Sequence, residues 1–395
     1  MKTLHDFDFS YKNVLVRCDL NVPMKDSKIT DDNRIRESLA TLQYLIDQQA
    51  KVIVFSHLGR VKTEEDKKGK SLEPVAKVLS ELLGKDVLFC FETRGDTLEA
   101  MVESMDPGDV LLVENTRFED VDGNKESGND LELGAYWASL GDYFVNDAFG
   151  TCHRAHASNV GIASYLPSAC GFLVEKELEV LGGAIRDPKR PFVVILGGAK
   201  VHDKIGLIEH LLTIADRIII GGGMSFTFLK AQGYEIGKSL LDEESLDFCD
   251  RILAEASQKL VLPIDCVVTT EVVSGSPSRV VSVSEIREDE IGVDVGPETI
   301  HIYQDVLKDA KTIIMNGPMG VFEIPDFAKG TQALFELMAK SDAITIVGGG
   351  DSGSAAKNMG FSGKFTRIST GGGASLELLE GKVLPGIEVL DRKRV

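Results

Sequence analysis

The chain has 395 residues, of which 43% are hydrophobic, so it can bury sizeable cores, and its length predicts two domains. Lys and Arg total 43 against 62 Asp and Glu, and the net charge of -19 should repel nucleic acid and anionic membranes. The first residues lack the pattern of a secretory signal, and no apolar run approaches the roughly 18 residues that span a bilayer. We therefore expect a cytoplasmic protein that binds neither nucleic acid nor membrane, and that captures any anion through a local cationic site.

Six cysteines are scattered along the chain without a Cys-x-x-Cys pair, which is typical of reduced cytosolic thiols. Only Cys152 stands in a segment that also carries histidines, Thr-Cys-His-Arg-Ala-His (151–156). A catalytic thiol or a His-x-x-His metal site is an alternative there, although the pattern shows no third or fourth ligand.

Short apolar runs rich in β-branched residues recur, each followed by a turn and then by a longer helical pattern. This order is typical of βα units and favours two open parallel sheets over one barrel. In the first half the expected strands are 13–16, 52–55, 87–89, 110–113 and 143–145. In the second half they are 192–196, 217–220, 261–268, 312–315, 343–347 and 366–368.

A break in this pattern falls at residues 172–190. The run Leu-Val-Glu-Lys-Glu-Leu-Glu-Val-Leu predicts an amphipathic helix, and Arg-Asp-Pro-Lys-Arg-Pro predicts the loop that ends it. We expect residues 1–171 and 191–375 to form the two domains, and residues 172–190 to form the interdomain helix and hinge.

Basic side chains follow the strands of the first half. In open parallel sheets ligands bind outside the carboxyl ends of the strands. Arginine or histidine stands in several segments there: 17–21, 56–60, 114–117 and 146–154, together with Arg34. Because arginine presents a planar fork of donors, their convergence would bind a small, highly charged anion. Any single arginine could instead pair with a surface carboxylate.

Glycine follows the strands of the second half, in the segments 197–200, 221–223, 317–320, 348–352 and 371–373. Glycine lets backbone N–H groups and helix N-termini approach a phosphate closely, so this half is predicted to bind a nucleotide. Tight turns alone would explain one or two such clusters, but five poorly. Lys200 and Lys204, four residues apart at a predicted helix start, should share one helical face and point towards the same polyphosphate.

The segment 348–353 satisfies G-x-G-x-x-G after a strand, which would permit a dinucleotide site. No Asp or Glu stands about 20 residues further on, where a ribose-binding acid is expected, so a nicotinamide dehydrogenase is disfavoured. Asp351 in this loop is better interpreted as a carboxylate for Mg²⁺, which takes one or two carboxylates together with substrate phosphates.

Seven of these segments resemble one family: Val-Arg-Cys-Asp-Leu-Asn-Val-Pro (16–23), Ser-His-Leu-Gly-Arg (56–60), Glu-Asn-Thr-Arg-Phe (114–118), His-Arg-Ala-His-Ala-Ser (153–158), Gly-Gly-Ala-Lys-Val (197–201), Asn-Gly-Pro-Met-Gly-Val-Phe-Glu (316–323) and Ser-Thr-Gly-Gly-Gly-Ala-Ser (369–375). They resemble the phosphoglycerate kinases in that family's order and approximate spacing. The resemblance covers essentially the whole chain.

The resemblance implies two Rossmann-like α/β domains, with a C-terminal tail, residues 376–395, that packs back on the first domain. It implies that 3-phosphoglycerate or 1,3-bisphosphoglycerate is held by the first domain through Asp19, Leu20, Asn21, Arg34, His57, Leu58, Gly59, Arg60, Arg117 and Arg154. It implies that ADP or ATP is held by the second domain through Gly198, Ala199, Lys200, Lys204, Gly221, Gly292, Asn316, Pro318, Val321, Glu323, Gly349, Gly350, Asp351 and Ser352. Glu323 would contact the ribose and Asp351 the magnesium ion.

The implied reaction passes a phosphoryl group between 1,3-bisphosphoglycerate and ADP. Its nucleophiles are already ionised at neutral pH, so it needs positioning and charge stabilisation rather than a general base. We assign those roles to Arg34, Lys200, Lys204 and the helix start at Gly371, Gly372 and Gly373. Hinge closure would bring the substrates together and exclude water, and the family resemblance favours a monomer.

Two rival functions are weighed against this one. A non-catalytic nucleotide-binding protein would be expected to lack Arg34 or the lysine pair, which are present. A structural or nucleic-acid-binding second role gains no support from the net charge.

Overall fold

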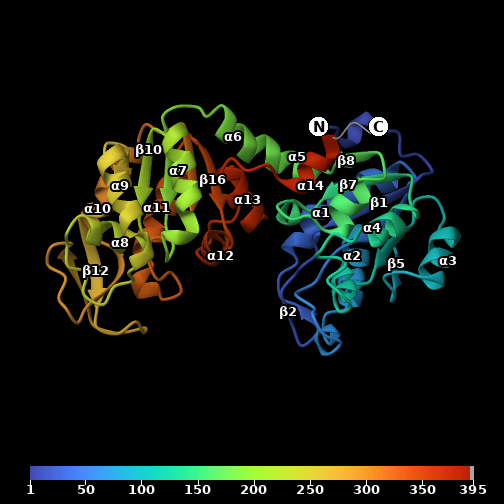
Figure 1. The fold of residues 1–395 in the computed structure, drawn as a ribbon, viewed down its shortest axis with the longest axis horizontal. Coiled ribbons are helices and arrows are strands. Elements are labelled where there is room, and N and C mark those ends of the chain that lie inside the picture. Colours follow the sequence, from blue (N-terminus) through green and yellow to red (C-terminus); the bar gives the residue numbers. More distant parts are fainter. Residues whose placement is uncertain (392–395) are drawn as a thin grey trace. The chain divides into compact units, whose positions relative to one another are not determined.

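Two parallel β-sheets organise the fold, one in each of two units (Figure 1). The structure is a computed structural model that describes residues 1–391. One unit contains Met1–Leu178 and, among the described residues, the C-terminal segment 383–391, and the other contains Glu179–Lys382. None of the helices in the described part of the chain combines the length and apolarity that crossing a membrane requires.

The sheet of the first unit has six parallel strands in the order β5-β6-β4-β1-β7-β8. Their bounds are β1 Asn13–Cys18, β4 Lys51–Phe55, β5 Val87–Cys90, β6 Val110–Val113, β7 Tyr143–Asp147 and β8 Ser168–Cys170. A two-stranded antiparallel hairpin, β2 Met24–Lys25 and β3 Lys28–Ile29, follows β1. Because the six strands run in one direction, the loops that follow them all begin at the same edge of the sheet.

Helices of this unit are α1 Asn33–Asp47, α2 Glu73–Leu83, α3 Asp96–Ser104, α4 Leu131–Ala138, α5 Phe172–Glu177 and α14 Pro385–Glu388. Shorter helices cover Leu4–Asp6, Glu65–Lys67, Thr116–Asp120, Phe149–Thr151, Ala157–Gly161 and Val389–Asp391. The second helix has proline in its first turn and ends at Gly84, whose φ of 66° is the left-handed conformation that glycine adopts without strain.

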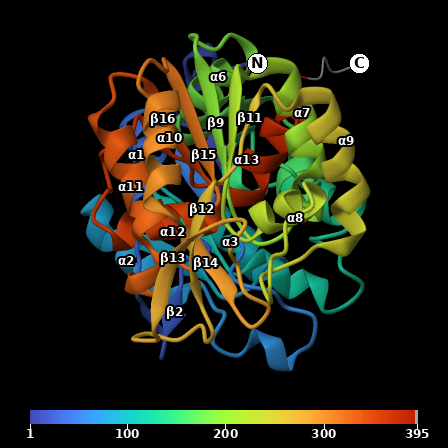
Figure 2. The same ribbon diagram turned by 90° about the vertical axis from the view of Figure 1, so that its left-hand side faces the viewer.

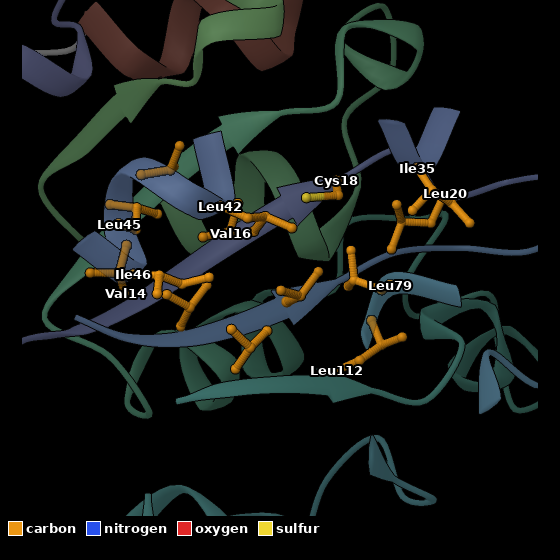
Figure 3. Packing of buried hydrophobic residues seen from close by; sticks show 14 of the residues in the cluster. Val14, Val16, Cys18, Leu20, Ile35, Leu42, Leu45, Ile46, Leu79 and Leu112 are labelled. Atoms are coloured by element: carbon orange, nitrogen blue, oxygen red, sulfur yellow. The ribbon is translucent and has the colours of Figure 1, made fainter. Parts of the chain in front are cut away.

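Hydrophobic side chains of α1 and β1 form the core of the first unit. Buried residues of α1 recur on one helical face and meet the apolar side chains of β1, as Figure 3 shows for Val14, Val16, Cys18, Leu42, Leu45 and Ile46. Every residue of β1 after Asn13 is buried, as expected for a parallel strand covered on both faces.

The main sheet of the second unit has the order β11-β10-β9-β15-β16-β17, again with all strands parallel. Their bounds are β9 Phe192–Leu196, β10 Arg217–Ile220, β11 Leu260–Val261, β15 Thr312–Asn316, β16 Ile344–Gly348 and β17 Arg367–Ile368. Figures 1 and 2 show this sheet between helices on both of its faces. The predicted α/β class with two open parallel sheets is therefore confirmed.

The helices of the second unit are α6 Gly183–Arg186, α7 Ile205–Ile214, α8 Met224–Ala231, α9 Leu246–Ala256, α10 Pro297–Leu307, α11 Lys329–Lys340, α12 Gly350–Asn358 and α13 Gly372–Leu379. Short 3-10 helices cover His202–Lys204, Glu243–Ser245 and Pro325–Phe327, and a π-helix, Leu178–Gly182, begins at the last residue of the first unit before its transition to the second.

The predicted strand 261–268 is wrong, because two strands of different sheets occupy that region. The strand β11 ends at Val261 in the main sheet, and β12 Asp265–Thr269 belongs to an antiparallel sheet with β13 Ser278–Ser282 and β14 Ile291–Val295. Pro263 lies between them and lacks the N–H that a continuous ladder needs. Figure 2 shows this small sheet beyond one end of the main strands.

Two expected boundaries differ from those of the units. The chain passes from one unit to the other at Leu178, inside the helical segment 172–186, so only part of the expected connector belongs to each. The expected tail begins too early at 376, because residues 376–382 belong to the second unit. There α13 packs on α7, and a Cβ added to Gly381 would lie 2.7 Å from the ring of His210.

The described C-terminal segment 383–391 packs on the first unit (Figure 1). The side chain of Asn146, at the end of β7, donates a hydrogen bond to the carbonyl of Gly386 at 3.0 Å. The ammonium group of Met1 pairs with Asp391 at 2.8 Å. The first contact connects the segment to the sheet edge that carries the basic loops, and the second connects it to the N-terminus.

Asp147, the last residue of β7, is fully buried at this edge. Its Oδ1 accepts a hydrogen bond from the backbone N–H of Leu173 in α5 at 2.9 Å. Burial raises the pKa of Asp147 to about 7, although hydrogen bonds from Thr41 and from the N–H groups of Leu173 and Val174 act in the opposite direction. The carboxyl group is therefore protonated in the folded protein at mildly acidic pH.

We expect the Asp147→Asn variant to change how stability depends on pH. Between about pH 4 and about pH 7 the unfolded carboxyl group ionises while the folded one keeps its proton, so this group's contribution to the free energy of unfolding falls as pH rises. Asparagine keeps an acceptor oxygen and does not ionise. Across this window wild type should lose up to a few kcal/mol relative to the variant, at about 1.4 kcal/mol per pKa unit.

Urea unfolding followed by circular dichroism at a series of pH values measures this difference. The Asp47→Asn variant, at an exposed position of α1, controls for the loss of one carboxylate from the same unit. A difference between wild type and Asp147→Asn that stays constant with pH would contradict the expectation.

Candidate functional site

The carboxyl edge of the first sheet gathers most of the expected anion-binding residues. The loops after β1, β4 and β6 and the start of α1 meet there through side-chain contacts. The carboxylate of Asp19 accepts a hydrogen bond from Arg34 Nη1 at 2.5 Å, and the side chain of Asn21 accepts one from the N–H of Gly59 at 2.8 Å. The N–H of Leu20 donates to the hydroxyl of Ser56 at 2.9 Å.

Asn115, which follows β6, fixes the two neighbouring loops. Its Oδ1 accepts hydrogen bonds from the N–H of Leu58 at 3.0 Å and from the N–H of Arg117 at 3.1 Å. Its Nδ2 donates to the carbonyls of Leu58 at 2.8 Å and Lys70 at 2.9 Å. The fully buried side-chain amide of Asn115 therefore holds the loop after β4 and the 3-10 helix that carries Arg117 together.

Arg117 lies in that 3-10 helix and is mostly enclosed, with 12% of its side chain exposed. Its Nη1 donates to Asp120 at 3.2 Å and to the hydroxyl of Ser127. Its Nε is buried without a hydrogen-bond partner among the described residues. Arg60 and Arg154 are exposed, and Arg154 Nε lies 3.1 Å from Nε2 of His153.

Arg17 behaves differently from the other arginines, since its side chain is completely buried rather than open to an anion. Its Nε donates to the hydroxyl of Ser158 at 2.8 Å, and its Nη2 lies 3.1 Å from Nδ1 of His57. Glu126, also fully buried, lies 3.9 Å from the same Nη2. The strand position of Arg17 was visible in the sequence, but its burial and its partners Glu126 and Ser158 were not.

Two histidines at this edge are kept neutral. Burial lowers the pKa of His57 well below its usual range, and the charges of Arg17, Arg117 and Arg34 lower it further. Burial lowers the pKa of His156 to about 3, with contributions from Arg17, Arg117 and Arg154. Because Arg117 influences both pKa values, these residues form one cationic cluster, made of Arg34, Arg117 and Arg154 around His57 and His156. The arginines carry its positive charge. His156 is not among the site residues expected from the sequence.

The thiol and metal alternatives at Cys152 gain no support. Cys152 is fully buried, and burial raises the pKa of its thiol, so the nucleophilic thiolate is disfavoured. Throughout the described residues, no three His, Cys, Asp or Glu side chains are grouped as a metal site would require.

In the second unit, glycines allow the backbone segments after β9, β10 and β15 to approach one another closely. A Cβ on Gly317, whose φ is 100°, would lie 2.2 Å from the carbonyl oxygen of Gly197. A Cβ on Gly222, whose φ is 65°, would lie 2.6 Å from the amide nitrogen of Gly198. Glycine at these positions is therefore required by contact between loops.

A pocket of about 210 Å³ opens beside these loops. Seven of the residues expected to bind nucleotide line it: Gly198, Ala199, Gly292, Pro318, Val321, Glu323 and Asp351. Its wall also includes the apolar side chains of Phe226, Leu229 and Leu240, and a Cβ on Gly292 would lie 1.9 Å from the ring of Phe226. Such a largely apolar pocket suits a nucleotide base.

Lys204 and Asn316 lie next to each other at the end of β15. The ammonium group of Lys204 donates to the carbonyl of Asn316 at 3.2 Å and to its side-chain oxygen. Lys204 ends a 3-10 helix just before α7, whereas Lys200 lies in the preceding loop and is exposed. The expectation that the two lysines share one helical face is therefore wrong, because α7 begins only at Ile205.

Two helix N-termini meet near Asn316. Gly349 and Gly371 precede the first residues of α12 and α13, and a Cβ on Gly372 would lie 3.4 Å from the amide nitrogen of Gly350. A Cβ on Gly349 would lie 3.3 Å from the side-chain amide nitrogen of Asn316. Unsatisfied N–H groups and two helix dipoles thus favour an anion at this point.

Other expected residues support this arrangement without lining the pocket. The hydroxyl of Ser352 accepts a hydrogen bond from the N–H of Gly317 at 2.7 Å, and the N–H of Gly221 donates to the carbonyl of Leu196 at 2.8 Å. Gly373 lies exposed in the first turn of α13.

Asp351 stands in the first turn of α12 and is exposed at the pocket. No side chain or backbone group of the described residues forms a hydrogen bond or ion pair with its carboxylate. One open carboxylate beside an anion site fits a magnesium ion that arrives with nucleotide phosphates, since Mg²⁺ takes few protein ligands. It does not fit a cation held by protein groups alone.

Burial lowers the pKa of Lys204 to about 8, although the carboxylates of Asp203 and Asp351 favour its charged form. Below pH 8 folding therefore carries the full cost of burying this charge. From about pH 8 to about pH 10.5 the unfolded chain holds more protons at this group, so its contribution to the free energy of unfolding rises with pH.

We expect the Lys204→Met variant to lack this rise. Across the window wild type should gain up to a few kcal/mol relative to Lys204→Met, as measured by urea denaturation at closely spaced alkaline pH values. The Lys200→Met variant, altered at the exposed lysine of the preceding loop, is the matched control. Parallel stability curves for wild type and Lys204→Met would show the expectation to be wrong.

Comparisons with known proteins agree along the whole length of the chain. A family model described as phosphoglycerate kinase matches residues 4–382. The phosphoglycerate kinases of Listeria innocua and Enterococcus faecalis are each 60% identical to the chain over 393 and 394 residues, which is 99% of both sequences in each pair.

Solved structures give the same result. The structure of phosphoglycerate kinase from Coxiella burnetii has a TM-score of 0.89 and 42% identity, and covers 98% of both chains. The one from Pyrococcus horikoshii has a TM-score of 0.85 and 34% identity, covering 99% of this chain and 98% of that one. With a family model that spans nearly the whole sequence and relatives that align from end to end, the chain belongs to the phosphoglycerate kinase family.

Proposed function

We propose that the chain carries out the family's reaction with 3-phosphoglycerate at the cationic edge of the first unit and magnesium nucleotide at the glycine-rich edge of the second. Membership of the family makes the chain a kinase of glycolysis that acts on 3-phosphoglycerate and ADP or ATP. What we propose beyond this is which residues bind the two substrates. The main support is one observation, the close approach of the N-termini of α12 and α13 beside Lys204 and Asn316.

The cationic cluster supports a small anionic substrate in the first unit. The chain carries a net charge of -19, so an arrangement of Arg34, Arg117 and Arg154 around two neutral histidines is not a general property of its surface. The arginine forks would hold the carboxylate and phosphate of 3-phosphoglycerate, with Arg60 from the loop after β4. Asp19 and Asn21 orient Arg34 and the loop at Gly59.

The second unit would hold the nucleotide in three parts. The apolar wall at Phe226, Leu229 and Leu240 would take the base, and the exposed carboxylate of Glu323 at the pocket would accept from the ribose hydroxyls. The phosphates would lie toward the N-termini of α12 and α13 and toward Lys204. When bound, magnesium on Asp351 would neutralise and orient those phosphates.

The reaction needs no general base, because a carboxylate or a β-phosphate attacks in its ionised form. Catalysis then depends on holding the two substrates in line and on stabilising charge on the transferred group. Arg34, Lys200 and the N–H groups at Gly371, Gly372 and Gly373 are assigned to that charge, and Lys204 to the nucleotide phosphates. Asn316 restrains Lys204 through two hydrogen bonds, which reduces the motion of the ammonium group.

The two substrates are assigned to different units, so transfer requires that they be brought into contact. We propose that this happens by closure around the segment 172–190, which would also exclude water from the reactive acyl phosphate. We further propose a monomer that works in the cytoplasm, in keeping with six cysteines that are all buried and unpaired.

The first test measures ADP formation from magnesium ATP and 3-phosphoglycerate by wild type, Arg34→Met and Lys200→Met. Each variant should lose roughly 10²–10³-fold in turnover, as expected when one preorganised donor to the transferred group is removed. Chelation of divalent metal should abolish the wild-type rate, and added Mg²⁺ should restore it.

The matched controls remove cations to which no role in binding or transfer is assigned. Arg36→Met lies on α1 near Arg34, where Arg36 pairs with Asp32 at 2.8 Å, and Lys230→Met lies on α8. Both should keep nearly full activity, and circular dichroism confirms folding of all four. Full activity in Arg34→Met or Lys200→Met would refute the assigned roles, while an inactive but folded wild type would refute the function.

A second test uses small-angle X-ray scattering. With both 3-phosphoglycerate and a non-reacting magnesium nucleotide bound, the radius of gyration should fall below that with either ligand alone. The forward scattering should give the mass of one chain. An unchanged radius in the doubly liganded protein would refute closure, and a doubled mass would refute the monomer.

A further inference from the structure

A buried ionic network of Arg17 and Glu126 contacts the cationic cluster through His57. Arg17 and Glu126 both have fully buried side chains, and Arg17 Nη2 lies 3.9 Å from Glu126 Oε1. Glu126 Oε1 accepts from the hydroxyls of Thr116 at 3.1 Å and Ser158 at 2.5 Å, and its Oε2 accepts from the N–H of Ser158 at 2.9 Å. Removing either charge alone would leave the other buried and uncompensated.

Arg17 must be the donor in each of its hydrogen bonds. A guanidinium group has only donors and keeps its charge at every pH at which a protein is folded. Its Nε donates to the hydroxyl of Ser158 at 2.8 Å, which in turn donates to Glu126. Its Nη2 meets His57 Nδ1 at 3.1 Å, so Nδ1 must be the acceptor.

A neutral imidazole that accepts at one nitrogen carries its proton on the other. His57 must therefore be the tautomer with hydrogen on Nε2. No group among the described residues is hydrogen-bonded to that nitrogen, and 9% of His57 remains exposed. The ring thus offers one N–H donor to whatever anion occupies the cluster.

We propose that Arg17, supported by Glu126, is a positioning residue that locks His57 as the neutral Nε2–H tautomer and so presents a pH-independent hydrogen-bond donor to the anionic substrate. That this anion is 3-phosphoglycerate rests on the function proposed above for the first unit. Arg17 acts through His57, because it has no exposed surface with which to touch a ligand.

The arginines that face His57 oppose its protonation. Arg17 comes from β1, Arg34 from α1 and Arg117 from the 3-10 helix after β6, while His156, from the segment after β7, is itself neutral. The negative charge of Glu126 is taken up by hydrogen bonds and by Arg17. A histidine with the usual pKa would change charge just where the substrate phosphate also titrates. Because the locked ring does not titrate in this range, only the substrate phosphate changes its charge there.

Nuclear magnetic resonance of protein with ¹⁵N-labelled histidine tests the tautomer without any substrate. The signal of His57 is identified by its absence from the His57→Gln variant. In wild type it should show a protonated Nε2 and an unprotonated Nδ1, unchanged from about pH 5 to about pH 8, where an ordinary histidine changes charge. A proton on Nδ1, or titration within this range, would overturn the proposal even if no Arg17 variant folds.

Kinetics then test the consequence for substrate. In the Arg17→Met variant the KM for 3-phosphoglycerate at pH 8 should rise severalfold, because part of the neutral ring then carries its proton on Nδ1 and presents no donor to the substrate, with a smaller change in kcat. The ratio of this KM to that of wild type should fall toward pH 5.5, because loss of Arg17 removes one cation and leaves the carboxylate of Glu126 uncompensated. Both changes raise the pKa of His57, and the protonated ring donates again. Taking the ratio at each pH cancels the titration of the substrate.

The Arg17→Lys variant, which keeps a donor near Nδ1, should restore a ratio that is independent of pH, and Arg36→Met should give a ratio of one. A KM ratio for Arg17→Met that is raised equally at all pH values indicates a structural role only and overturns the proposal. Loss of all turnover in folded wild type would instead refute the proposed function, while the tautomer measurement would still decide the proposal about Arg17.

Discussion

Parallel pairing of the strands is the constraint on which the rest of this structure depends. Because β1, β4, β6 and β7 run in one direction, the loops after them meet at a single edge, although β1 and β7 lie more than a hundred positions apart in the sequence. The same constraint brings the glycine-rich loops after β9, β10, β15 and β16 together in the second unit. Each site is thus a consequence of strand direction, and loop composition decides only which ligand it fits.

Both edges bury charge, and they do so differently. In the first unit Arg17 is balanced by Glu126, and the pair is enclosed by hydroxyl and backbone donors. In the second unit the described hydrogen-bond partners of Lys204 are the neutral oxygens of Asn316, and its charge is opposed by burial. A balanced pair suits a residue that must hold its geometry at every pH. A buried lysine without a paired carboxylate is destabilising in its charged form, which supports the proposed role of Lys204 at the nucleotide phosphates.

Sequence patterns succeeded where a local signal has one physical meaning. Runs of β-branched residues predicted nearly all strands of both sheets, and glycines after strands marked loops that approach within contact distance. They failed where two meanings compete. The apolar run 261–268 contains Pro263, and the choice between one strand and two depends on which sheet offers partners. Lys200 and Lys204 were placed on one helix because spacing alone cannot reveal that α7 begins at Ile205.

By itself the sequence determined the α/β class, the basic character of one half, the glycine loops of the other and the family resemblance, because each resides in residue type and short-range spacing. Tertiary structure alone decided that Arg17 is buried, that Glu126 and Ser158 are its partners and that His57 accepts at Nδ1. Those facts depend on which atoms of distant segments come within hydrogen-bond distance, 2.8 Å between Arg17 and Ser158, and on the removal of water around them. Neither proximity nor desolvation is encoded at any single position, since both arise only when the sheet edge is assembled.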